Sequence, residues 1–283
     1  MHIEAKLPLL VFGGPYSNLR ALAALRQRAD ELGIPAAQTI CTGDVVAYCA
    51  EPEETTRAVR DWGCHVIAGN CEEQLAETSD NCACGFEPGT ECDTLAKGWY
   101  PFANARMSGE SRAWMAALPK TLTFTAGGLS FRVIHGGVDV INHFVFASQR
   151  DVLAEELERA DADVVIAGHA GVPFIEKVGS GIWFNPGVIG MPANDGTPDA
   201  WYGLIRWEDG HIVLSTHRLA YDHHAAAAAM RRCGHANGYA RTLVTGLWPS
   251  LDVFPPAERA ATGRKLRPRT LLVPASAAAH AAE

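Results

Sequence analysis

Short strands and helices alternate from the start of the chain, and this alternation limits the fold more than any other feature. Apolar runs at residues 7–12, 39–41 and 65–68 each end in a polar turn that contains glycine. Between these runs, residues 18–32 and 52–62 carry apolar side chains at helical spacing. A strand–helix–strand–helix–strand order is typical of an α/β fold with a buried sheet.

Two segments break this regular pattern. Residues 76–106 are rich in Gly, Cys, Asn, Asp and Glu and lack clear periodicity, so we expect an irregular insertion that forms a flap. Residues 255–283 are rich in Pro, Arg and Ala, which predicts a disordered tail. Between the two segments, residues 121–134 and 202–216 alternate around glycine-containing turns and indicate two hairpins.

The composition is that of a globular protein, with 48% hydrophobic and 20% charged residues. The net charge of −8 argues against sequence-blind binding of a nucleic-acid polymer or of an anionic membrane. No apolar run approaches the roughly 20 residues of a membrane span. Residues 1–6 lack the basic start of a signal peptide, and the apolar run that follows is too short for one, so we expect a cytoplasmic protein. In that compartment most of the eight cysteines should be thiols.

Four apolar strands end in short polar turns, and each turn carries a side chain that can bind a metal ion: Asp44, Asn70, His135 and His169. Ligands of open α/β sheets gather at the carboxyl ends of the strands. Carboxylate, amide oxygen and imidazole together suit a hard-to-borderline metal ion. Each turn residue alone is equally well explained as a turn or helix cap, but four in succession predict one shared metal site.

The motifs around these residues carry a family resemblance, and they occur in the family's order: GDVV at 43–46, GNCE at 69–72, HGG at 135–137, GH at 168–169, NPGVIGMP at 185–192 and YDHHAAAAAM at 221–230. The chain resembles the calcineurin-like metallophosphoesterases over residues 8–246. It looks most like the small bacterial branch that includes phosphodiesterase and dinucleoside-polyphosphatase-like proteins.

The resemblance implies a four-layer αββα sandwich, in which two mixed sheets pack face to face with helices outside. It also implies a phosphoesterase domain over residues 1–219, a helical extension of the same domain over 220–254, and a two-metal centre that hydrolyses phosphate esters.

The chain departs from the family at one half of this centre. The family's first motif, Asp-x-His-x-Asn, aligns here with Gly14, Tyr16 and Asn18, and the final His of Gly-His-x-His aligns with Gly171. All three non-bridging ligands of one metal are therefore absent. The resemblance implies that all four ligands of the other metal are present, and they are Asp44, Asn70, His135 and His169.

Three interpretations follow. The first is a hydrolase of phosphate esters or anhydrides with one Mn, Fe or Zn ion. The second is a two-metal centre completed by substitute ligands. The third is a metal- or nucleotide-binding pseudoenzyme. A different reaction with a redox metal also stays open. The expected partner is a small phosphorylated substrate or ligand, and a homo-oligomer stays open.

Four residues are candidates for substitute ligands or for the substrate pocket, namely Tyr16, Asn18, Cys49 and His143. A phenolate can bind ferric iron, and a thiolate favours zinc, copper or iron. Each residue also has a structural interpretation. The Tyr16 ring would fill the vacated space, Asn18 would cap a helix, Cys49 would be a small buried residue, and His143 would face solvent or substrate.

Cys71 and Glu72 occupy the positions where many relatives carry a His–Asp pair that protonates the leaving group, so the resemblance makes them candidate catalytic residues. Cys82, Cys84 and Cys92 crowd into the insertion. Their spacing matches no recognised zinc finger, and a zinc site, a disulfide and a redox sensor remain alternatives to the favoured interpretation as free thiols.

Overall fold

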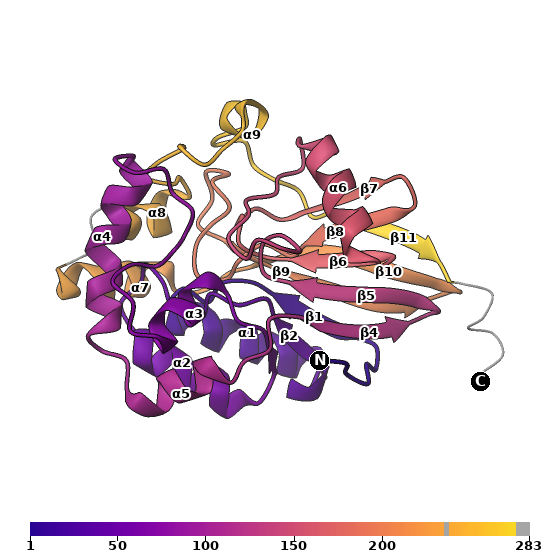
Figure 1. Ribbon diagram of the computed structural model, residues 1–283, viewed down its shortest axis with the longest axis horizontal. Helices are drawn as coiled ribbons and strands as arrows, with labels where there is room; N and C mark the ends of the chain where they lie inside the picture. The colour runs from indigo at the N-terminus through magenta and orange to yellow at the C-terminus, as the bar shows by residue number, and fades with distance from the viewer. Residues whose placement is uncertain (235–237, 276–283) are drawn as a thin grey trace.

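The structure is a computed structural model that describes residues 1–234 and 238–275. Its strands form two mixed sheets (Figure 1). The first sheet has the strand order β11 (Thr270–Pro274), β10 (His211–Leu219), β9 (Ala200–Glu208), β1 (Leu9–Phe12), β2 (Thr39–Cys41) and β3 (His65–Val66). The second has the order β4 (Leu122–Ala126), β5 (Leu129–Ile134), β6 (Val164–Ala167), β8 (Gly181–Asn185) and β7 (Phe174–Val178).

The centre of each sheet is parallel. In the first sheet β1, β2 and β3 run parallel, and in the second β5, β6 and β8 do. The neighbouring pairs, such as β1 with β9 and β4 with β5, are antiparallel. Parallel strands end at the same edge of a sheet, so the turns after β2, β3, β5 and β6 can meet.

Strand β1 shows why both faces of the sheet are buried. Its alternate residues Leu9 and Val11 join the core between the two sheets, which also contains Phe124 of the second sheet. Leu10 and Phe12 point the other way, into the core beneath the helices. A strand that is buried on both faces becomes a continuous apolar run, as in this sequence.

Helices cover the outer face of each sheet. Those packed in the core over the first sheet are α1 (Leu19–Glu31), α2 (Pro52–Trp62), α3 (Asn70–Ala76), α4 (Glu91–Asn104), α5 (Gly109–Ala116), α7 (His223–Cys233) and α8 (Tyr239–Thr245). Helix α6 (Arg150–Ala160) covers the second sheet, α9 (Pro256–Ala260) lies near it, and a 3-10 turn at Ala36–Gln38 precedes β2 (Figure 1). The predicted four-layer αββα sandwich is confirmed.

The two segments expected to be irregular contain regular elements. Helix α4 lies within 76–106, and the sequence concealed it because Gly98 and Pro101 interrupt its helical pattern. The expectation of a disordered tail is wrong for residues 255–275, which form α9 and β11. Strand β11 pairs with β10 and packs Leu271 and Val273 against the core between the sheets. Residues 276–283 lie outside the described part of the chain.

The extension helices α7 and α8 share the core over the first sheet, where Ala227, Met230 and Leu243 are buried with side chains of α1. The domain boundaries proposed from the sequence remain a prediction. Among the described residues, no helix is both long and apolar enough to span a membrane.

Candidate metal centre

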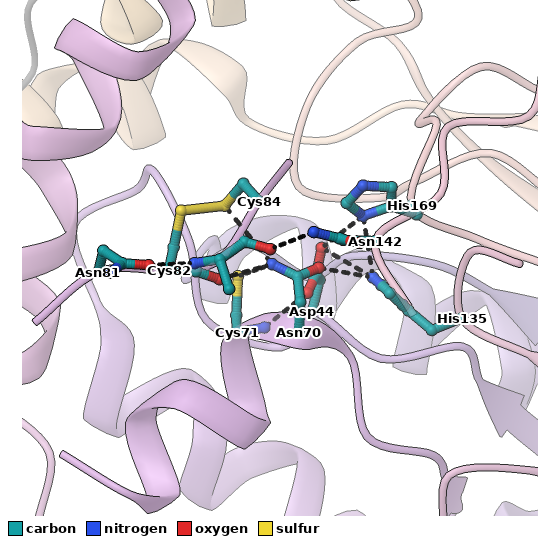
Figure 2. The surroundings of a disulfide bond; sticks show 10 residues. Asp44, Asn70, Cys71, Asn81, Cys82, Cys84, His135, Asn142 and His169 are labelled. Carbon is teal, nitrogen blue, oxygen red and sulfur yellow. Dashed lines mark hydrogen bonds and ion pairs between the residues drawn. A yellow bond between two sulfur atoms is a disulfide. The ribbon is translucent and has the colours of Figure 1, made fainter. Parts of the chain in front are cut away.

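Four polar side chains from the two sheets meet where the parallel strands end (Figure 2). Asp44 lies in the turn after β2, and Asn70 begins α3 after β3. His135 follows β5 directly, and His169 follows β6. Asp44 and His169 adopt left-handed backbone angles, with φ of 56° and 52°. Such angles cost energy in residues other than glycine and are concentrated at functional sites.

The four side chains lie within reach of one ion. His135 Nε2 lies 3.1 Å from Asn70 Oδ1, 3.1 Å from His169 Nδ1 and 3.3 Å from Asp44 Oδ2. His169 Nδ1 lies 3.9 Å from the same Asp44 oxygen. All four residues are buried. The structure therefore brings together all four residues that the sequence predicted as one ligand set.

The hydrogen bonds around the cluster leave lone pairs facing each other. His135 Nδ1 lies 2.6 Å from the Thr42 carbonyl and donates its proton there, so Nε2 of the neutral ring is an acceptor. Asn70 donates from Nδ2 to the Cys82 carbonyl at 2.8 Å, which turns its Oδ1 toward His135. Two acceptors 3.1 Å apart repel unless a proton or a cation lies between them. The donor set thus fits a metal ion.

Electrostatics favours the metal-binding protonation states of Asp44 and His169, whereas His135 would have to lose a proton. Burial raises the pKa of Asp44, but the neighbouring His135 and His169 outweigh it and hold that pKa well below its usual range. Burial lowers the pKa of His169, so its ring is neutral at neutral pH. Burial also lowers the pKa of His135, but the Asp44 carboxylate outweighs it and the net shift is upward. Metal binding at this cluster would displace any proton held by His135.

Glu72 holds the Asp44 turn in place. Its buried carboxylate accepts the backbone N–H groups of Asp44 at 2.7 Å, Val45 at 2.8 Å and Gly69 at 2.9 Å, with Val46 at 3.4 Å. Burial, together with the charge of Asp44, raises the pKa of Glu72 to about 7. Because both carboxylate oxygens are occupied by the backbone, the geometry favours a positioning role over proton donation.

Cys71 lies next to the cluster but is sealed from solvent. Its backbone N–H points at Asp44 Oδ1 at 3.4 Å, and its Sγ lies 3.6 Å from Asn70 Nδ2. Burial raises the pKa of the thiol well above its usual value, and the nearby carboxylates add to this. The thiol is therefore protonated, and it is a much weaker acid than an imidazolium.

Aromatic rings occupy the space where the resemblance places the missing ligands. The Tyr16 ring lies against Gly14 so closely that a Cβ atom on Gly14 would lie 2.5 Å from two ring carbons. The ring also packs edge-on against Tyr48, with centroids 4.9 Å apart, and burial raises the pKa of its phenol well above the usual value. A Cβ atom on Gly171 would meet the Trp248 ring at 3.1 Å. Tyr16 is thus a neutral space-filling side chain here.

The other three candidate substitutes have structural partners outside the cluster. Asn18 caps α1 through the Ala21 N–H at 3.2 Å and donates to the Gly190 carbonyl at 3.0 Å. Cys49 Sγ lies 3.7 Å from the same carbonyl, and burial raises the pKa of its thiol. His143 is partly exposed and pairs with Glu156 at 3.2 Å. Among the described residues, neither Cys49 nor His143 belongs to a metal-sized group of ligands.

The tip of the insertion lies against the cluster, where the sequence predicts a flap that leaves directly from the Asn70 motif. Besides the bond from Asn70 to Cys82, Asn142 donates to the Ala83 carbonyl at 2.9 Å (Figure 2). Phe144 places its ring 4.2 Å from that of His169. The contacts made by Asn142 and Phe144 could not be predicted from the sequence, because each joins segments far apart in the chain.

The prediction of free thiols in the insertion is wrong for two of the three cysteines. Cys82 and Cys84 form a disulfide, and Asn70 Nδ2 lies 3.5 Å from Cys84 Sγ (Figure 2). Cys92 is a free, buried thiol. The close spacing of the first two cysteines was the available signal, and it allowed a disulfide as readily as a metal site.

Comparison with known families agrees with this geometry. The model of the calcineurin-like phosphoesterase superfamily domain matches residues 17–210, which is more than half of the chain. The chain belongs to the calcineurin-like phosphoesterase superfamily. The family resemblance drawn from the motifs is therefore confirmed. Members of this superfamily generally use divalent metal ions, and the Asp44–His135–His169 group offers a site for one.

Two solved structures show the same phosphoesterase fold. A metallophosphoesterase from Sphaerobacter thermophilus is 20% identical with a TM-score of 0.64, and the match covers 85% of this chain and 99% of that one. A hypothetical protein from Pyrococcus horikoshii OT3 is 17% identical with a TM-score of 0.70, and the match covers 87% and 99%. No curated protein matches the chain.

Proposed function

We propose that this phosphoesterase hydrolyses a small phosphate ester or anhydride with a single metal ion. The observation that carries the proposal is the meeting of Asp44, Asn70, His135 and His169, while Tyr16 fills the space of the second ion. A metal ion held by these four residues supplies positive charge that polarises a phosphoryl oxygen and makes water more acidic.

The protein holds the four ligand side chains in position and keeps water away from them by burial. Thr42 fixes the tautomer and orientation of His135, and Glu72 fixes the turn that carries Asp44. Nε2 of His169 is buried and has no hydrogen-bond partner among the described residues, and the same ring lines a pocket. This nitrogen is therefore available to a bound ligand.

The pocket beside His169 limits the substrate. It holds only about 50 Å³ and is walled largely by the rings of Tyr16, Tyr48, Phe86, Phe144, Tyr239 and Trp248. Among the described residues that line it, none is a lysine or an arginine. We infer that it receives an apolar or planar organic group, and that the tip of the insertion must move aside to admit a substrate. The contact between Phe86 and Phe144, 6.1 Å between ring centroids, would open in that movement.

His135→Ala should abolish metal retention, because it removes the ligand nearest to the other three. His224→Ala is the matched control, since His224 is exposed on α7 and outside the cluster. Elemental analysis after dialysis against manganese, iron or zinc should give about one ion per chain in the parent and in the control. Turnover of an aryl phosphodiester and an aryl phosphomonoester should disappear with the ion. Retention of the ion by His135→Ala would contradict the proposed ligand set.

A second candidate function is ligand binding without turnover. The Tyr16 ring against Gly14 and the Trp248 ring over Gly171 favour it, because they have replaced the half of the centre that would stabilise a leaving group. A parent protein that retains one ion but hydrolyses neither phosphoester would support this candidate over the hydrolase.

A further inference from the structure

A second hollow lies beside α9 and β7, the outermost strand of the second sheet, and among the described residues it shares no lining residue with the pocket at His169. It encloses about 500 Å³, which is within the usual range of small-molecule sites. Apolar side chains in and just before β7 and α9 form its floor, with Val172, Phe174, Phe254 and Ala257 among them. We call it the C-terminal groove.

Four cations line the C-terminal groove, and they are Arg264, Lys265, Arg267 and Arg269. Across the described parts of the chain, none of these four side chains forms an ion pair or a side-chain hydrogen bond. The chain as a whole carries a net charge of −8, so this basic run contrasts with its surroundings. A concentration of free guanidinium groups is well suited to phosphate, which arginine binds through two parallel hydrogen bonds.

The carboxylates that line the groove already have partners. Glu176 pairs with Arg150 at 2.7 Å, and Asp195 pairs with Arg218 at 2.5 Å. Glu258 accepts hydrogen bonds from the backbone and the hydroxyl of Ser148, at 3.0 Å and 2.6 Å. Two of the three acids are thus paired with arginines outside the groove, and among the described residues only Glu258 keeps an uncompensated charge, so the four cations leave the groove with a net positive charge.

The backbone that carries the cations is fixed. Gly263 donates to the Asn194 carbonyl at 2.9 Å, and Leu266 donates to Asp195 at 3.0 Å. Arg218 donates to the Leu266 carbonyl at 2.7 Å, and the Arg269 N–H donates to Thr216 Oγ1 at 2.9 Å. These bonds hold the basic segment as one wall of the groove.

We propose that the C-terminal groove binds a nucleoside diphosphate, with the base on the apolar floor and the phosphates on the arginines. The volume suits a ligand of this size, the floor offers apolar contact to a planar base, and the basic wall offers four cations to two phosphates. This site is separate from the metal centre and stands whether or not the proposed hydrolysis occurs.

Titration calorimetry with ADP tests the proposal on the full chain without added metal. ADP should bind at least about tenfold more tightly than adenosine or inorganic pyrophosphate alone, because only ADP engages both the floor and the arginines. Arg267→Gln/Arg269→Gln should weaken ADP binding by about tenfold or more. The control Arg231→Gln/Arg232→Gln, at two exposed positions on α7, should leave it unchanged.

His135→Ala separates this site from the metal centre, and it should bind ADP as the parent does. The proposal is overturned if the parent does not bind ADP at millimolar concentration, or if pyrophosphate binds as tightly as ADP. Unchanged ADP affinity in Arg267→Gln/Arg269→Gln, or loss of ADP binding in His135→Ala, would also overturn it.

Discussion

Glu72→Gln should destabilise the fold by about 3 kcal/mol or more and should abolish metal retention. The carboxylate of Glu72 accepts four backbone N–H groups from the Asp44 turn and the start of α3, and it is fully buried. A glutamine keeps the shape but turns one acceptor oxygen into an NH2 donor that faces backbone donors. Each buried polar group left without a partner costs about 1–3 kcal/mol. The Asp44 turn would then shift away from His135.

Urea unfolding of the metal-free protein measures the stability loss, and elemental analysis measures the bound ion. Glu77→Gln is the matched control, because Glu77 is exposed at the end of the same helix. We expect it to change stability by less than about 0.5 kcal/mol. If Glu72→Gln were as stable as Glu77→Gln and kept its ion, the positioning role of Glu72 would have to be abandoned.

Gly14→Asp alone should fail to rebuild the second metal site and should cost about 3 kcal/mol or more. Its Cβ would overlap the Tyr16 ring at 2.5 Å, and φ of +28° at this position is unfavourable for a residue with a side chain. Tyr16→Ala should relieve the overlap, so the double variant should be more stable than the sum of the single effects predicts. Thermal unfolding of the four proteins in this cycle gives the coupling energy, and additive effects would show that the ring does not block the site.

The triple variant Gly14→Asp/Tyr16→His/Gly171→His tests whether the vacated site lacks only its ligands. We expect a second manganese equivalent and faster turnover of an aryl phosphodiester, because two ions stabilise the attacking and leaving oxygens together. Trp248 must shift to admit the new side chain at residue 171. A folded triple variant with one ion per chain would show that the aromatic packing has rebuilt this half of the centre for another purpose.

The sequence was sufficient to predict that the polar side chains of the ligand cluster meet, because each lies at a position set by the end of a strand. Asp44, His135 and His169 each follow the end of a parallel strand closely, and strand ends can be identified from apolar runs. The role of Glu72 could not be predicted in this way. Its partners at residues 44–46 lie 26 to 28 positions away, and only the folded backbone brings them to its carboxylate.

Strand β11 was missed for a similar reason. Its run of apolar residues at 271–273 is short and follows a Pro- and Arg-rich segment, so local pattern favoured disorder. Its stability as a strand comes from pairing with His211–Ser215 of β10, more than fifty residues earlier. Strand formation depends on such neighbours more than on local propensity.

The position of β11 at the end of the first sheet protects part of β10 from edge-to-edge pairing. Strand β10 is nine residues long, and without β11 about half of its outer edge would expose unpaired N–H and C=O groups. Such an edge is a template for another copy of the chain. Strand β11 replaces it with a five-residue edge that ends at Pro274, a residue that cannot donate to a further strand. A chain truncated after residue 254, where the Pro-, Arg- and Ala-rich segment begins, would lack β11. The edge of β10 would then be free to pair with a strand of a second copy of the chain.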